Sequence, residues 1–229
     1  MKSPENWTPP PAPARDAIAG RTARLEPLDE RLHGADLWAA FAGEDEGWRF
    51  MANGPFATEW AFREWLKAHA RDNEEPAFAV IDTASRRAAG LLSYMAIRPA
   101  SGVAEIGDVI FAPALRRTTA ATEAIFLALR RLFDLGYRRV EWKCDARNRA
   151  SRQAARRSGF EFEGLFRQHM IVKHANRDTA WFAMLDGDWP GRRQAFEAWL
   201  APENFNADGR QLRPLAAFEP PDAPVIDLG

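Results

Sequence analysis

The chain has 229 residues, a formal net charge of −1 and 46% hydrophobic residues, which is enough for one sizeable core and too little for two full domains. Its single cysteine, Cys144, excludes an internal disulfide and a zinc site built from cysteines, and we expect no metal. No apolar run approaches the roughly 20 residues that span a bilayer, and the first residues lack the apolar core of a signal peptide. We therefore expect a soluble, cytoplasmic protein without a membrane partner.

Positive charge is concentrated in one part of the chain. Between residues 116 and 157, 12 Lys and Arg residues stand against 4 Asp and Glu residues. A nucleic-acid binder usually has a basic face over the whole domain or aromatic residues between the basic ones, so we expect no nucleic-acid partner. A small ligand with several phosphates would suit such a local patch.

The first half of the chain predicts a strand, two helices and a sheet of antiparallel strands. Residues 1–20 are rich in proline and alanine and form a predicted extension. Alternation predicts a strand over 21–28, and Asp29 and Thr58 are expected to begin the two helices. The loop between the helices carries Trp48 and Phe50. Three more strands are predicted at 77–82, 88–97 and 103–111, joined by polar turns.

The segment from Val103 to Leu135 predicts a buried strand, a short basic turn and a long helix. Pro113 ends the strand, and apolar residues then recur at helical spacing. The start of a helix has unpaired N–H groups and a partial positive charge, and here arginines and threonines surround it. The segment therefore predicts a phosphate site, but neither a P-loop nor the pattern G-x-G-x-x-G is present.

The second half predicts a strand at 138–145, a helix capped by Asn148, and strands at 160–172 and 179–185. A short amphipathic helix with Phe196, Trp199 and Leu200 follows Trp189. The helix between the strands at 103–111 and 138–145 makes those two strands parallel. The element order therefore predicts an α/β fold around a mixed sheet.

Two motifs resemble the GNAT superfamily of acyl-CoA N-acyltransferases. The turn RRTTAA at 116–121 is similar to the family's Q/R-x-x-G-x-G/A, with Thr119 where the family usually has its first glycine. Asn148 and Ser151, followed by GFEFEG at 159–164, resemble the ribosomal-protein N-terminal acetyltransferases of the Rim group. The resemblance implies a GNAT-like, mostly antiparallel sheet of about seven strands, with a parallel splayed pair in the middle and helices on both faces. It covers a domain at 21–187, between extensions at 1–20 and 188–229.

The resemblance also implies acetyl-CoA as cosubstrate. Backbone N–H groups at the end of the central strand would bind the pantetheine and the thioester carbonyl, the turn would bind the pyrophosphate, and basic residues of the following helix would bind the 3′-phosphate. The CoA-binding residues predicted in this way are Val109, Ile110, Phe111, Arg116, Arg117, Thr118, Thr119, Ala120, Ala121, Thr122, Asn148, Ser151, Arg152 and Arg156.

The resemblance places the hydroxyl of Ser151 near the CoA sulfur, where it would stabilise the leaving thiolate; the alternative is a plain helix-start residue. Relatives that use a tyrosine acid carry it where this chain has Ala155. Cys144 offers a further alternative, a covalent acyl intermediate.

Glu105 is the candidate general base, since that region faces the acceptor in related enzymes; it could instead be an exposed strand-end charge. A Rim-type glutamate would fall on Met170, and the neighbouring His169 is a second candidate that points to the opposite face. Trp48, Phe50 and His169 are the predicted contacts to the acceptor, with core packing as the alternative for the two aromatic residues.

We therefore expect an N-acyltransferase that moves an acetyl group from acetyl-CoA to a primary amine by direct attack. The acceptor would be a protein N-terminus or a small-molecule amine, and a homodimer is compatible with this interpretation. The alternative is a non-catalytic module with a GNAT fold that binds CoA or a protein partner.

Overall fold

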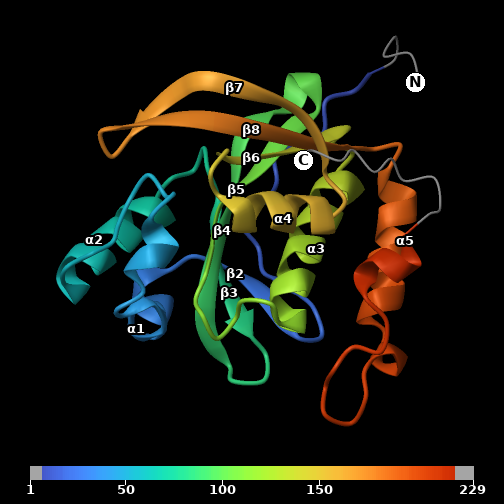
Figure 1. The fold of residues 1–229 in the computed structure, drawn as a ribbon, viewed down its shortest axis with the longest axis horizontal. Coiled ribbons are helices and arrows are strands. Elements are labelled where there is room, and N and C mark those ends of the chain that lie inside the picture. The colour runs from blue at the N-terminus through green and yellow to red at the C-terminus, as the bar shows by residue number, and fades with distance from the viewer. Residues whose placement is uncertain (1–6, 220–229) are drawn as a thin grey trace.

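A computed structural model describes residues 7–219 and shows one mixed sheet with helices on both faces (Figure 1). The strand order is β1-β2-β3-β4-β5-β6-β8-β7. The strands are β1 (Ile18–Ala19), β2 (Ala23–Pro27), β3 (Ala77–Asp82), β4 (Arg87–Arg98), β5 (Val103–Phe111), β6 (Arg139–Asp145), β7 (Glu161–Val172) and β8 (Ala175–Leu185). The helices are α1 (Glu30–Phe41), α2 (Glu59–Ala70), α3 (Thr119–Asp134), α4 (Arg149–Arg157) and α5 (Trp189–Leu200).

The predicted mixed, mostly antiparallel sheet is confirmed, with eight strands instead of about seven. The additional strand is β1, which lies inside the predicted N-terminal extension and pairs Ile18 with Leu25. Ile18 is buried, and Asp16 forms a two-pronged ion pair with Arg131 of α3. The fold therefore begins before residue 21, because apolar burial and this pair attach the segment to the domain. Residues 1–6 of the predicted extension lie outside the described part.

Two apolar clusters fill the space between the sheet and its helices. One packs α1 and α2 on the first face of the sheet, around Leu37, Phe62 and Leu66. The other packs α3 on the opposite face, around Leu92, Ile106 and further buried residues. The predicted helix after Trp189 is confirmed as α5, which stacks Trp189 on Phe133 and Phe196 on Phe126 of α3. No helix within residues 7–219 is long and apolar enough to cross a membrane.

The parallel pairing of β5 with β6 is short. It covers three register positions, the last of which joins Glu105 to Glu141. Both strands continue, to Phe111 and to Asp145, without further pairing to each other. The predicted splay is therefore present, and it opens immediately beyond the two glutamates.

A bulge in β5 lies beside the splay. The register with β4 changes from Ser93 opposite Gly107 to Leu91 opposite Ile110, which leaves one extra residue in β5. Asp108 has a φ of 49° and occupies the bulge. A Cβ at Gly107 would lie 2.3 Å from the sulfur of Met95, so a larger residue before the bulge would require the Met95 side chain to move. The bulge reverses the alternation of β5, so Glu105 and Asp108 lie on the same face of the sheet, that of α2.

A buried carboxylate holds the start of β2 against α3. Glu123 is 5% exposed and accepts hydrogen bonds from the backbone N–H groups of Arg21, Thr22 and Ala23 at 2.8, 2.5 and 2.8 Å. The hydroxyl of Thr22 donates to the same carboxylate at 2.6 Å. Hydrogen bonds to a buried charge are among the stronger ones in proteins, so this residue is important for attaching the N-terminal strands.

Glu123→Gln should lower the free energy of unfolding by about 1.5–3 kcal/mol, because an amide has one acceptor oxygen where the carboxylate has two. Urea unfolding followed by tryptophan fluorescence measures the change. The control is Glu197→Gln in α5, whose ion pair with Arg193 is exposed and should matter by no more than about 0.5 kcal/mol. Equal changes for both variants would contradict a special role for Glu123.

Candidate active site at the splayed strands

The start of α3 offers unpaired backbone donors where the sequence predicted a phosphate site. Thr118 caps the helix, accepting from the N–H of Ala121 at 3.1 Å while its hydroxyl donates to the carbonyl of Leu115 at 2.7 Å. Among the described residues, the N–H groups of Arg117, Thr119 and Ala120 have no backbone acceptor. Three such donors at the positive end of a helix dipole can receive an anion.

The arginines around this helix start differ in where they point. Arg116 donates to Glu44 at 2.7 Å and to the carbonyl of Phe111 at 2.8 Å, so its guanidinium lies against the neighbouring loop. Arg157 of α4 reaches the first turn of α3, with a guanidinium nitrogen 3.5 Å from the hydroxyl of Thr122. Sequence reasoning named Arg152 and Arg156 on α4 but missed Arg157. The one available signal was its place in the same basic run.

Ser151 stands in the first turn of α4, as predicted. Asn148 caps this helix by accepting from the N–H of Ser151 at 3.0 Å. The indole N–H of Trp142 in β6 donates to the hydroxyl oxygen of Ser151 at 3.0 Å. The hydroxyl oxygen already has a donor, so its own proton can be donated, and the neighbouring sulfur of Cys144 is one acceptor for it.

Cys144 lies beside Ser151 and is buried. Burial raises the pKa of the Cys144 thiol, and a hydrogen bond with Ser151 opposes this rise in part. A thiol with a raised pKa is a poor nucleophile at neutral pH, so the structure gives no support to a covalent intermediate on Cys144.

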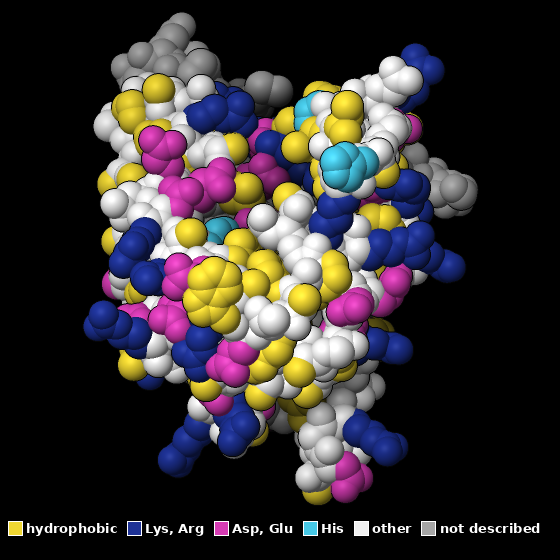
Figure 2. Space-filling model, turned by 90° about the vertical axis from the view of Figure 1, so that its left-hand side faces the viewer, with side chains coloured by type: hydrophobic (Ala, Val, Ile, Leu, Met, Phe, Trp, Pro, Cys, Tyr) yellow, Lys and Arg dark blue, Asp and Glu magenta, His cyan; other side chains and the backbone are white. Residues whose placement is uncertain are grey.

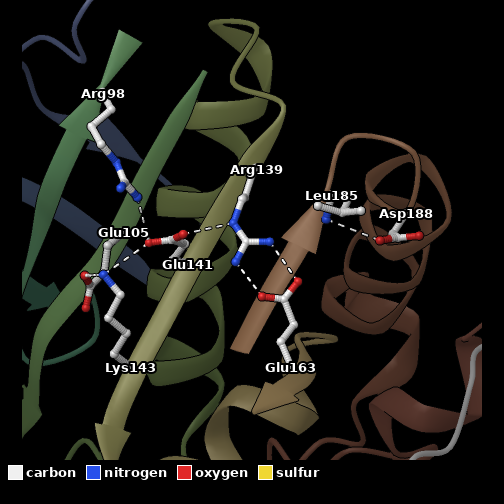
Figure 3. A network of polar contacts seen from close by, with 8 residues as sticks. All are labelled: Arg98, Glu105, Arg139, Glu141, Lys143, Glu163, Leu185 and Asp188. Carbon is white, nitrogen blue, oxygen red and sulfur yellow. Dashed lines mark hydrogen bonds and ion pairs between the residues drawn. The ribbon is translucent and has the colours of Figure 1, made fainter. Parts of the chain in front are cut away.

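On the opposite face of the sheet, an ion-pair network closes the splay at its base (Figure 3). Glu105 and Glu141 are register neighbours on parallel strands, and two like charges so placed repel each other. The ammonium of Lys143 lies between them, 2.7 Å from Glu105 and 3.1 Å from Glu141. Arg98 contacts the same oxygen of Glu141 as Lys143, at 3.1 Å, and Arg139 contacts the other oxygen at 2.9 Å.

The pKa values of the two glutamates in this network are shifted in opposite directions. Burial raises the pKa of Glu105, and the positive charge of Lys143 offsets only part of the rise. For Glu141 burial acts in the same sense, but hydrogen bonds from Arg139 and Lys143 outweigh it and lower the pKa. Glu105 is 8% exposed and ion-paired, so the predicted alternative of an exposed strand-end charge is wrong.

A second polar constellation on this face was missed by sequence reasoning. His69, in the last turn of α2, has its Nε2 atom 3.6 Å from Oδ2 of Asp108 and 3.2 Å from the hydroxyl of Ser93. Trp65 stacks on the imidazole with ring centroids 5.3 Å apart. Asp108 occupies the bulge of β5. The sequence shows a histidine near a helix end and an aspartate in an apolar strand, but nothing in it brings the two together.

Comparisons with known proteins identify the family. A model of the acetyltransferase (GNAT) domain matches residues 23–161. The crystal structure of a GCN5-related N-acetyltransferase from Brucella melitensis is 49% identical, with a TM-score of 0.91 over 93% of this chain and 98% of that chain. The chain belongs to the GNAT acetyltransferase family.

Other solved structures support the same assignment at lower similarity. A probable acetyltransferase of the GNAT family from Chromobacterium violaceum is 47% identical over 83% of this chain and 96% of that chain, with a TM-score of 0.78. The Salmonella typhimurium enzyme that modifies the N-terminal serine of ribosomal protein L7/L12 is 21% identical over 74% of this chain and 99% of that chain, with a TM-score of 0.64, and shows the fold alone. No curated protein sequence matches the chain.

In this GNAT protein the hairpin of β7 and β8 lies beside the face of the sheet that carries Glu105 and Asp108. Lys173 at its tip donates to the carbonyl of Trp48 at 2.8 Å, which joins the hairpin to the loop after α1. His169 lies in a bulge of β7 and contacts the hydroxyl of Thr179 at 2.9 Å. Figure 2 faces the α2 side and shows the surface hollowed here, with acidic side chains along one rim and a histidine at its base.

The predicted acceptor contacts occupy different environments. Trp48 is 2% exposed and packs edge-on against Phe56 and Trp65, so its side chain belongs to the core and only its carbonyl reaches the hairpin. Phe50 is half-buried beneath the guanidinium of Arg49. His169 is exposed on the hairpin. Of the three side chains, that of Trp48 is too buried to contact a ligand.

Lys143→Met should destabilise the protein by about 3–5 kcal/mol at pH 8, since it leaves Glu105 buried without its counter-charge. The loss should shrink towards pH 5. A carboxyl group whose folded pKa is raised is stabilised by protonation, so its cost is removed as the pH falls through that pKa.

Chemical unfolding at the two pH values measures this change. Lys67→Met, which breaks an exposed pair with Glu64 on α2, is the control and should change stability by less than about 1 kcal/mol at either pH. A deficit for Lys143→Met that grows on acidification would contradict the assignment of Glu105 as the group left unpaired.

Proposed function

We propose that this GNAT protein is an acetyl-CoA-dependent N-acetyltransferase that acts on a primary amine, either a protein N-terminus or a small molecule. The observation that carries the proposal is the splay between β5 and β6, because the two faces of the sheet beside it carry different polar groups. The unpaired amides of α3 and the hydroxyl of Ser151 belong to one face. Glu105 and Asp108 stand on the other.

In the proposed complex, the α3 start binds the pyrophosphate through the amides of Arg117, Thr119 and Ala120. The basic residues of α4, among them Arg152 and Arg157, lie on the side where a further phosphate would be neutralised. Backbone alternation from Ala112, whose N–H bonds the carbonyl of Ala89 in β4, turns the N–H of Phe111 towards the splay. That donor is available to a pantetheine amide or a thioester carbonyl.

Ser151 supports the leaving group in this proposal. A thiolate leaving near the first turn of α4 meets the positive end of the helix dipole and the hydroxyl of Ser151. A hydroxyl is a much weaker acid than a thiol, so it stabilises the thiolate by a hydrogen bond and does not give up its proton. Direct attack by the amine is consistent with a buried, protonated Cys144.

The activity test separates the enzyme from a module that only binds CoA. Acetyl-CoA and CoA should raise the melting temperature, since a ligand that binds the folded state stabilises it. Thiol release measured with amines, polyamines and peptides should then show turnover. Stabilisation without thiol release from any acceptor would favour the non-catalytic alternative, and absence of both would refute CoA binding.

Ser151→Ala should lower kcat by about 10- to 150-fold, the equivalent of one hydrogen bond to a charged group worth about 1.5–3 kcal/mol. Acetyl-CoA affinity should change little, because the bond forms as the thiolate leaves. Steady-state thiol release gives kcat, and calorimetry gives the affinity. Ser158→Ala at the other end of α4 is the matched control, and an equal loss in both variants would contradict the leaving-group role.

Arg116→Ala should weaken CoA binding by about 1.5–3 kcal/mol, measured by calorimetry, because it removes a positive charge from the turn and leaves Glu44 unpaired beside it. The double variant with Glu44→Gln then distinguishes two causes. Binding stays weak if Arg116 contacts a phosphate directly, and recovers if Arg116 acts by neutralising Glu44. Unchanged binding in the single variant would place the phosphates elsewhere.

A further inference from the structure

His69 and Asp108 form a closely held pair that no step described above uses. Trp65 stacks on the imidazole, and the hydroxyl of Ser93 and the carboxylate of Asp108 both lie near its Nε2 atom. The His69 side chain is 12% exposed and that of Asp108 is 26% exposed. The carboxylate is therefore partly open to solvent, while its Oδ2 atom faces the imidazole.

The pair stands at the mouth of the splay. Asp108 comes three residues after Glu105, where the pairing of β5 with β6 ends. Its bulge places the carboxylate on the face of α2, and Val109 and Phe111 follow directly along the edge that faces the opening. An amine that approached the splay from the hollow would pass Asp108 before it reached those backbone donors.

The charges around Asp108 suit a group that gains and loses a proton. Burial raises the pKa of Asp108, and the positive charges of His69 and Arg177 oppose the rise. Burial also raises the pKa of the neighbouring Glu75, with the charge of Asp108 as the next cause. The titratable groups that face this point are His69 on α2, Glu75 before β3, Glu105 on β5, Lys143 on β6 and Arg177 on β8.

Glu105, the base predicted from the sequence, is less free to act. One of its oxygens is 2.7 Å from the ammonium of Lys143, and its side chain is 11% exposed. A proton taken up there would break an ion pair that the network at the base of the splay needs. Within residues 7–219, no lysine or arginine forms an ion pair with Asp108, whose nearest charged partner is His69 at 3.6 Å. The carboxylate of Asp108 can therefore change protonation at lower cost.

We propose that the His69–Asp108 pair is the proton acceptor for the amine, an inference that rests on the proposed acetyl transfer. Asp108 takes one proton from the acceptor ammonium and leaves a neutral amine, and His69 is the positioning residue that orients and tunes the carboxylate. The amine nitrogen bonds to the thioester carbonyl carbon, and the carbon–sulfur bond breaks. The nitrogen's second proton ends on the thiolate, and the pair returns its proton to water.

The experiment measures the pH dependence of kcat/KM for thiol release, with acetyl-CoA and the best amine of the panel. Asp108→Asn should lower the rate at pH 7 by about 100-fold or more and remove the acidic limb that the wild type shows. His69→Gln keeps a polar side chain beside Asp108 but loses the imidazole charge that lowers the pKa of this carboxyl. Its acidic limb should therefore move to higher pH. Acetyl-CoA affinity should stay within about threefold of the wild type in both variants.

Two further variants make the result specific. Glu74→Gln changes an exposed carboxylate one residue before Glu75 and should keep the wild-type profile. Glu105→Gln tests the rival base. If Glu105→Gln abolishes the acidic limb while Asp108→Asn keeps both the limb and the rate, the pair is not the proton acceptor and the proposed acetyl transfer still stands. A wild type that releases no thiol with any amine would overturn both proposals.

Discussion

The architecture of the site depends on the parallel strands β5 and β6, which pair over only three positions and then separate. Glu105 and Glu141 face each other at the last paired position, and an isolated pair of like charges there would weaken the sheet at the point where it opens. Lys143 and the arginines at 98 and 139 convert this repulsion into a network that holds the base of the splay closed. The strands separate directly beyond this network, because their pairing ends at the two glutamates.

The two faces of the sheet beside the splay carry different chemical groups. On the α3 and α4 face, two helix starts and Ser151 provide donors for negative charge, which suits phosphates and a leaving thiolate. On the α2 face, carboxylates and an imidazole provide proton acceptors around Asp108. A thioester within the opening would meet both sets of groups at once, and the acceptor would approach from the side opposite to the cofactor. The two polar sets therefore need no contact with each other.

Sequence patterns predicted the parts of the site that local structure determines. The caps Asp29, Thr58 and Asn148 begin the helices expected of them, because a cap depends on residues within one turn. The register of a bulge and the partner of a side chain across the sheet depend on tertiary packing. For that reason the pairing of His69 with Asp108 and the bond from Arg116 to Glu44 were not predictable, whereas core packing of Trp48 was already one of the two expected alternatives. β1 was missed because two residues carry no periodicity.

The threonine in the phosphate turn shows how tertiary structure removes an apparent conflict in the sequence. Thr119 stands where the family usually has a glycine, and a β-branched residue with positive φ would be strained. In the structure the left-handed conformation falls on Arg117, with a φ of 63°, and Thr119 is the first helical residue after the cap Thr118. Its N–H remains unpaired, so the turn keeps the donor that an anion needs without a glycine at that position. In this turn the left-handed conformation is taken by Arg117, two positions before Thr119, so Thr119 can begin the helix without strain.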